Sequence, residues 1–178
     1  MRKSRILSKL IVAIVTGALM LGASTSVLAQ SKDKDKDRKT KETVAMSQQV
    51  YEKLVEIQEL IEAKEYAQGQ IAIEELKEKK NLSDYERAQI YNLLAYSYYL
   101  QERFEEAIRA YDMVLAQPDL PEALMMSTLK TKSQLHFQQE QYEEALRVIR
   151  QLIAALEEPA ADVLMIEGQA LFQLQRYD

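Results

Sequence analysis

Apolar and polar residues follow one another along most of this chain with the three- and four-residue spacing of amphipathic helices. Beyond residue 43 the pattern contains only two glycines, and its three prolines are Pro118, Pro121 and Pro159. Because proline disrupts a helix interior, these three mark helix starts and stops. The spacing predicts seven helices, over residues 44–63, 66–80, 84–101, 104–117, 121–139, 142–156 and 160–175.

Local signals support this division of the chain. Ser83 is followed three residues later by Glu86, which is the spacing of a capping box at a helix start. The loops between the predicted helices are short, so neighbouring helices are expected to pack antiparallel. The pattern therefore predicts an all-α protein.

Part of the helical sequence is repeated. Residues 103–109 read RFEEAIR and residues 141–147 read QYEEALR, 38 positions later. The aromatic of this motif recurs at Tyr66, Phe104, Tyr142 and Tyr177, at spacings of 38, 38 and 35. Repetition at this period predicts a helical solenoid, in which stacked helix pairs replace a single central core.

The second of these units carries the most regular pattern of large and small residues. Its positions are Tyr91, Leu94, Ala95 and Tyr98 in the first helix, then Ala107, Tyr111 and Pro118. This pattern resembles the tetratricopeptide repeat (TPR), an antiparallel helix pair. Small residues at 95 and 107 allow two paired helices to approach closely, while the large ones fill the flanking space.

The other units follow the same pattern less closely. The third has Leu129, Lys132, Ser133, His136, Ala145 and Ile149, and the fourth has Leu164, Glu167, Gly168 and Leu171. Lys132 departs from the leucine that the pattern expects, and Gly168 falls at the position that requires a small residue. The first unit is degenerate, with Ile57 and Gly69 at the small positions, as expected of a terminal repeat. The resemblance covers residues 44–178, and the fourth unit lacks its second helix, so we expect a fragment or a stack without its cap.

The first 29 residues read as an export signal. Four basic residues precede an apolar run of 14 residues, from Leu10 to Ala23, and small residues follow it up to Ala29. This is the layout of a cleaved secretory signal peptide, which places the mature start at Gln30. The alternative is an uncleaved anchor, although the run is shorter than the roughly 20 residues of a membrane-spanning helix. The signal indicates export to the periplasm.

A charged segment separates the signal from the helices. Residues 30–43 are low in apolar side chains and mix lysine with aspartate, so we predict a disordered linker. Removing the four basic residues of the signal takes the net charge from −5 to about −9. Such an acidic protein repels phosphate backbones, and no nucleic-acid partner is expected. Asp33, Asp35 and Asp37 alternate as in a calcium loop, but Arg38 stands where that loop needs glycine.

No set of residues in the sequence suggests catalysis. The chain has no cysteine, and its one histidine, His136, occupies a packing position of the repeat. The glutamate pairs at 105–106 and 143–144 fall in the first turn of a helix, where negative charge suits the helix dipole. The sequence contains no metal-ligand spacing and no glycine-rich phosphate loop. We therefore expect a protein that is not an enzyme and needs neither metal nor cofactor.

The TPR resemblance implies a partner-binding groove lined by the first helix of each unit. Residues 5, 8 and 12 positions before each turn aromatic share one helical stripe. In units two to four they are Asn92, Tyr96, Tyr99, Lys130, Gln134, Phe137, Met165, Gln169 and Phe172. Their aromatic and amide groups suit an extended or helical peptide segment. The alternative is that the aromatics pack between successive units.

The charged linker and the second unit also resemble TPR proteins associated with TonB–ExbB–ExbD energy-transducing systems. That resemblance implies a partner in the envelope that serves outer-membrane uptake. The sequence thus predicts a non-catalytic periplasmic scaffold that binds a protein segment in a concave groove. The alternative function is structural, with the apolar fourth unit driving self-association, and an enzyme activity would require a further domain.

Overall fold

The computed structural model describes residues 46–176, which belong to the unit spanning Val44–Asp178. The predicted signal peptide (1–29) and linker (30–43) lie outside the described residues. The described part contains seven helices and no strand, which confirms the predicted all-α fold and all seven predicted helices. Their bounds are α2 Gln48–Glu62, α3 Tyr66–Lys77, α4 Asp84–Leu100, α5 Phe104–Leu115, α6 Glu122–Gln138, α7 Tyr142–Ala155 and α8 Ala161–Gln173.

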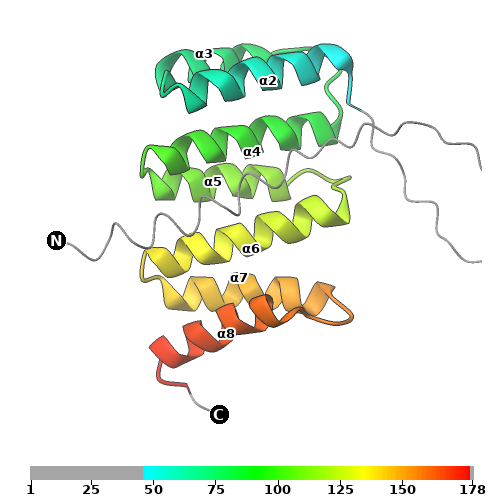
Figure 1. Cartoon of the computed structure of the whole chain (residues 1–178). Helices are drawn as coiled ribbons and strands as arrows, with labels where there is room; N and C mark the ends of the chain where they lie inside the picture. Colours follow the sequence, from blue (N-terminus) through cyan, green and yellow to red (C-terminus); the bar gives the residue numbers. More distant parts are fainter. Residues whose placement is uncertain (1–45, 177–178) are drawn as a thin grey trace, which may run out of the picture. The chain divides into compact units, whose positions relative to one another are not determined.

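The helices stack in consecutive antiparallel pairs (Figure 1). Helices α2 and α3 form the first pair, α4 and α5 the second, and α6 and α7 the third, while α8 packs on both α6 and α7. The first helices of successive pairs also meet, α2 with α4 and α6 with α8. Each pair thus packs mainly on its neighbours in sequence, which is the arrangement of a repeat solenoid.

Each first helix ends in the same turn. Lys64, Glu102, Glu140 and Gln175 all adopt left-handed backbone, with φ between 57° and 64°. In the second unit the Glu102 amide donates to the Tyr99 carbonyl and the Arg103 amide to the Tyr98 carbonyl, both at 3.0 Å. The other three turns have the corresponding bonds, so all four are Schellman motifs. None of them uses glycine at the left-handed position.

The turn aromatics pack back onto the helix that precedes them. The ring centroids of Tyr99 and Phe104 are 6.0 Å apart, and those of Phe137 and Tyr142 are 5.2 Å apart. Each contact joins residues five positions apart across the left-handed turn. In the second and third units, the recurring aromatic therefore packs the start of the second helix against the end of the first.

The small positions of the repeat are buried where paired helices approach. Ala95, Ala107 and Ala145 have no exposed surface. A Cβ atom added at Gly69 would lie 3.2 Å from Ile61 Cγ1, so the first pair also needs a small residue there. At Gly168 an added Cβ would meet nothing within 4 Å. The small position predicted at Gly168 stays a prediction, because the described residues contain no second helix of the fourth unit to pack against it.

The third unit contains a polar seam along α6, formed by Thr128, Lys132 and His136. All three side chains are buried, and they recur every four residues on one side of the helix. Lys132 replaces the expected leucine and forms an ion pair with Asp112 of α5, so packing at this position is retained. His136 Nδ1 lies 2.7 Å from Gln141 Oε1, consistent with the predicted structural role of this histidine.

Candidate functional site: the face of the first helices

The predicted groove residues lie on α4, α6 and α8, and they differ widely in exposure. Asn92, Tyr96 and Gln134 are half-buried, whereas Gln169 is exposed. One residue of each first helix lies eight positions before the turn aromatic of its unit. These equivalent residues form a row along α2, α4, α6 and α8: Gln58, Tyr96, Gln134 and Gln169. We call these four residues the middle row.

Tyr96 is the aromatic member of the middle row. Burial raises the pKa of its phenol, and the neighbouring Glu62 and Tyr66 raise it further. Glu62 accepts a hydrogen bond of 2.8 Å from Gln58 Nε2, so the first two members of the row share a polar surrounding. The phenol stays neutral at ordinary pH, and its ring offers a part-exposed apolar surface beside a carboxylate.

Gln134 carries the most unusual polar group on this face. Its Oε1 atom is buried and has no hydrogen-bond partner among the described residues, and the same is true of Gln138 Oε1. Gln138 lies one helical turn beyond Gln134 on α6, so both amides lie on one side of that helix. A buried amide oxygen without a donor costs free energy, so such positions are candidates for ligand contact.

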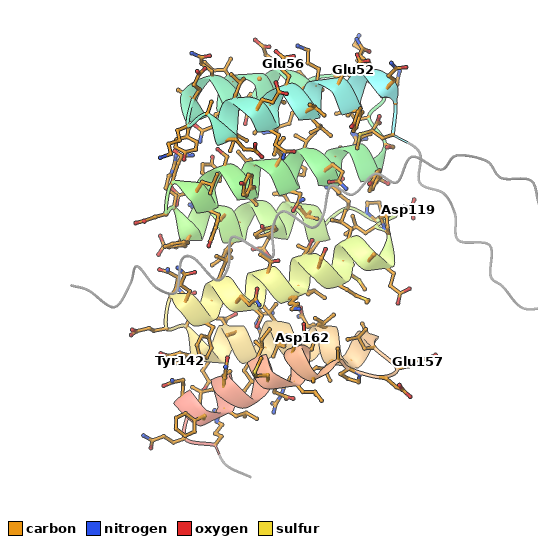
Figure 2. All side chains as sticks on the ribbon, in the orientation of Figure 1. Glu52, Glu56, Asp119, Tyr142, Glu157 and Asp162 are labelled. Atoms are coloured by element: carbon orange, nitrogen blue, oxygen red, sulfur yellow. The ribbon has the colours of Figure 1, made fainter. Side chains whose placement is uncertain are left out.

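Lys130 and Asp162 join the first helices of units three and four. The Lys130 ammonium donates to an Asp162 carboxylate oxygen, across from α6 to α8. Figure 2 labels Asp162 on α8. The hydrogen bond from Lys130 lowers the pKa of Asp162. Lys130 is therefore neutralised within the protein and does not supply an isolated positive charge to a partner.

The aromatic stripe predicted for the groove divides in the structure. Tyr99 is buried against Phe104, and Phe137 packs on Tyr142, so both rings pack across the turn between the two helices of their pair. Little of the Tyr99 ring is left for contact with a partner. Met165 and Phe172 of α8, in contrast, expose 57% and 64% of their surface. Partner binding by all nine residues stays a prediction, and the three that belong to the middle row, Tyr96, Gln134 and Gln169, are the best placed of them.

The sequence did not predict two residues that lie near this face, Gln138 and Glu62. Gln138 is four residues beyond Gln134, and Glu62 is four residues beyond Gln58. Extending each stripe by one helical turn toward the C-terminal end would have found both. Neither lies at one of the three positions counted back from the turn aromatics.

Other kinds of site find no support in the described part of the chain. Residues 46–176 contain no group of three or more His, Cys, Asp or Glu side chains placed to hold a metal ion. Among the same residues, no helix has both the length and the apolar character needed to cross a membrane.

Comparison with known families gives a match over most of the helical unit. Residues 59–175 match the family described as "RNPP family C-terminal domain". Neither the curated proteins nor the solved structures contain a match to this chain. The RNPP C-terminal domain is a TPR-like helical domain that binds peptides or proteins. From α2 through α8 the chain has the repeated helix pairs of this domain, and it belongs to the RNPP C-terminal domain family.

Proposed function

We propose that this chain is a non-catalytic, exported scaffold that captures a peptide segment of a partner along the first helices of its repeats. The middle row and the neighbouring Gln138 form the contact surface. Family membership supports a peptide or protein as the partner. The apolar and amide character of this row suits a segment that presents backbone amides and a few apolar side chains.

The unpartnered Oε1 atom of Gln134 is the observation that carries the proposal. A peptide lying across α6 brings backbone N–H groups, and each of these can donate one hydrogen bond. Pairing with Gln134 or Gln138 would satisfy an acceptor that has no donor in the described residues. Such a bond is worth about 0.5–1.5 kcal/mol, and removing a buried acceptor's donor costs about 1–3 kcal/mol. Because this atom is buried, the Gln134 side chain would have to rotate outward on binding, and the new hydrogen bond would then favour the bound state.

Tyr96 supplies the second part of the surface. Its ring is large, has few internal rotations and carries a polar hydroxyl, which makes tyrosine an effective contact residue. The adjacent Glu62 adds a negative charge at the α2 end of the row. A partner segment is expected to place an apolar or aromatic side chain on Tyr96 and to avoid an acidic residue beside Glu62.

The compartment that we propose is the periplasm. The basic start, the apolar run Leu10–Ala23 and the small residues up to Ala29 support export. Within the envelope, we propose a component of a TonB–ExbB–ExbD energy-transducing system as the partner protein, on the resemblance of the charged linker and the second repeat. A fusion of residues 1–43 to a periplasm-dependent reporter tests export separately from binding, and an inactive reporter would contradict it.

The binding proposal can be tested without knowing the natural partner. A library of random 12-residue peptides is selected on the purified protein, and the enriched peptide is titrated by calorimetry. Gln134→Ala and Tyr96→Ala should each weaken binding about tenfold, because each loses roughly 1–2 kcal/mol of contact. Helical circular dichroism should stay unchanged in both variants.

Gln151→Ala is the matched control for the glutamine substitution. Gln151 is an exposed residue of α7, a second helix of its pair, and lies outside the proposed surface. Its variant should bind the peptide as the unaltered protein does. Selection of no peptide, or equal affinity for all three variants, would contradict the proposed surface.

A further inference from the structure

One carboxylate on the proposed binding face has no cation to pair with. Glu62 ends α2, is exposed, and accepts a hydrogen bond of 2.8 Å from Gln58 Nε2. It belongs to none of the ion pairs among the described residues, and Lys64, two positions further along the chain, does not pair with it. Lys130, by contrast, is already paired with Asp162. In the described residues, the uncompensated charge of this face is therefore negative and lies at its α2 end.

Two tyrosines from neighbouring helices lie near this carboxylate. Tyr66 begins α3 directly after the turn, and Tyr96 belongs to α4, which packs on both α2 and α3. Helices α2 and α4 run in the same direction, so the turn after α2 lies at the same side of the stack as the end of α4 (Figure 1). Burial raises the pKa of the Tyr96 phenol, and Glu62 and Tyr66 lie close enough to raise it further. Side chains of three successive helices therefore meet beside the Glu62 carboxylate.

The polar atoms of this group are mostly hydrogen-bond acceptors. An ionised carboxylate only accepts, and Gln58 uses its amide nitrogen on Glu62, which leaves its amide oxygen to accept as well. Phenol oxygens can also accept, and the faces of tyrosine rings attract cations. An ammonium or guanidinium group carries only donors together with a positive charge, so it matches this set of acceptors. A carboxylate brought to the same place would be repelled by Glu62.

The equivalent positions of the other units carry no charge. The residues four positions after the middle row, in units one to four, are Glu62, Leu100, Gln138 and Gln173. Glu62 is thus the one charged member of these four. The helical repeat does not require the charge, since leucine and glutamine occupy the same place in the other units. A charge at one end of a row of neutral contacts can fix the register of a partner.

We propose that Glu62 and Gln58, with the phenols of Tyr66 and Tyr96, form a subsite for a lysine or arginine side chain of the bound segment. The subsite rests on the peptide-binding function proposed above and adds the chemistry of one partner residue. The basic side chain lies next to the apolar one that covers the Tyr96 ring, and its charged end reaches Glu62. Because the subsite is at the α2 end of the face, it also sets the direction in which the segment crosses the repeats.

Peptide selection on two forms of the protein tests the subsite directly. The library of random 12-residue peptides is selected in parallel on the unaltered protein and on Glu62→Gln. Lysine and arginine should be enriched at one position of the peptides that the unaltered protein selects. That enrichment should be absent from the Glu62→Gln selection. The enriched peptide is then synthesised with an acetylated N-terminus, so that only a side chain can supply the positive charge.

Calorimetry with this acetylated peptide measures the contribution of the charge. Glu62→Gln should bind the basic peptide about five- to tenfold more weakly, because it loses the carboxylate and keeps the side-chain shape. A peptide with glutamine in place of the basic residue should bind Glu62→Gln and the unaltered protein equally. Tyr66→Phe, which removes one phenol oxygen, should weaken binding of the basic peptide about two- to threefold.

Glu52→Gln is the matched control for the charge. Glu52 is also exposed on α2, where Figure 2 labels it, and it accepts a hydrogen bond of 2.8 Å from Gln48, the glutamine four residues before it. The two glutamates thus have the same kind of local partner, but Glu52 lies outside the proposed subsite. Its variant should bind the basic peptide as the unaltered protein does. Helical circular dichroism should be unchanged in all three variants.

The subsite and the binding face fail separately in these measurements. If Gln134→Ala weakens binding but the selected peptides show no basic preference, the subsite is overturned and the binding face stands. Equal affinity of Glu62→Gln and the unaltered protein for the basic peptide would have the same meaning. Equal weakening by Glu52→Gln and Glu62→Gln would also overturn the subsite, since the overall negative charge would then account for the preference. Selection of no peptide at all would overturn both.

Discussion

Glu86 connects two helix starts through one carboxylate. The capping box predicted from Ser83 and Glu86 is present, with the Glu86 amide donating to Ser83 Oγ at 3.2 Å. The Oε1 atom of the Glu86 carboxylate accepts a hydrogen bond of 2.9 Å from the Ser47 amide and one of 2.7 Å from the Ser47 hydroxyl. Ser47 is the N-cap residue of α2, so Glu86 fixes the start of α2 against the start of α4.

Acidification is expected to weaken the protein through Glu86. Burial raises the pKa of its carboxyl, but hydrogen bonds from Ser47 and Ser83 outweigh burial and lower it from 4.5 to about 2. The carboxylate therefore stabilises the fold fully above about pH 4.5, and this stabilisation is lost as the pH falls toward 2. The difference corresponds to up to about 3 kcal/mol of unfolding free energy.

Urea unfolding of the unaltered protein and of Glu86→Gln at pH 7 and pH 3 measures this contribution. Glu86→Gln should be less stable by about 2–3 kcal/mol at pH 7, because an amide cannot accept all the bonds of a carboxylate. The gap between the two proteins should narrow at pH 3, since only the unaltered protein loses stabilisation from the Glu86 carboxylate below pH 4.5, while the other acidic groups titrate in both and cancel. A gap that stays constant between pH 7 and pH 3 would refute the role of this carboxylate.

Lys132 and Asp112 form an unequal pair. The Lys132 side chain is almost wholly buried, whereas about half of the Asp112 side chain reaches solvent. Removing the lysine leaves a carboxylate that water can solvate, but removing the aspartate leaves a buried ammonium without its ion-pair partner. The two deletions should therefore differ in effect, although they break the same contact.

Substitution at each end of this pair tests the asymmetry. Asp112→Asn should lower the unfolding free energy by about 2 kcal/mol or more, because it leaves a buried charge poorly compensated. Lys132→Met, which keeps the volume and removes the charge, should be neutral or raise stability by up to about 1–2 kcal/mol. Thermal and urea unfolding of both variants provide the comparison. Equal losses would mean that the ion pair itself contributes the stability.

Among the secondary-structure elements, the four Schellman turns are the most regular feature of the chain. Glutamate occupies the left-handed position in two of them, at Glu102 and Glu140, where glycine is the usual residue. A residue with a side chain pays about 1–2 kcal/mol for left-handed backbone. In the second unit, two backbone hydrogen bonds and a ring contact hold the turn in place despite this cost. The Arg103 guanidinium also stacks over the Tyr98 ring, 4.5 Å from its centroid.

Glycine at these positions should relieve that strain. Glu102→Gly and Glu140→Gly are each expected to raise the unfolding free energy by about 0.5–1 kcal/mol, after the entropy of glycine is deducted. Glu105→Gly, in the first turn of α5, is the control and should lower stability by about 1 kcal/mol. Thermal unfolding of the three variants gives the ranking. A destabilised Glu102 variant would show that its side chain makes a stabilising contact that outweighs the strain.

For the molecule as a whole, periodicity predicted the fold closely. The apolar spacing and the repeated aromatics located all seven helices of the described residues, and each observed bound lies within a few residues of its prediction. Helix ends carry local signals, such as Ser83 with Glu86, and repetition of one motif reveals the stacking. Such information is local or periodic, and a single sequence contains it.

The candidate site was less accessible from the sequence, because it depends on contacts between elements. Tyr99 and Tyr96 lie on the same predicted stripe of α4, yet one is buried against Phe104 and the other is part-exposed. No pattern within α4 distinguishes them, since the difference comes from the return of the chain after the turn. The contacts of Glu86 with Ser47 and of Lys132 with Asp112 join residues 39 and 20 positions apart, and no repeat links them.

The turn at Gln175 shows how such a protein can change in size. At the end of α8 the chain has a residue in the same left-handed conformation, and the same two backbone hydrogen bonds, as at the ends of α2, α4 and α6. The four turns therefore share one backbone geometry, although the residue at the left-handed position differs among them. Recombination at these turns can join repeats from different parts of a gene, or from different genes, and still yield stackable helix pairs. New combinations of binding residues can thus arise by exchange of whole units, with no redesign of the joints between them.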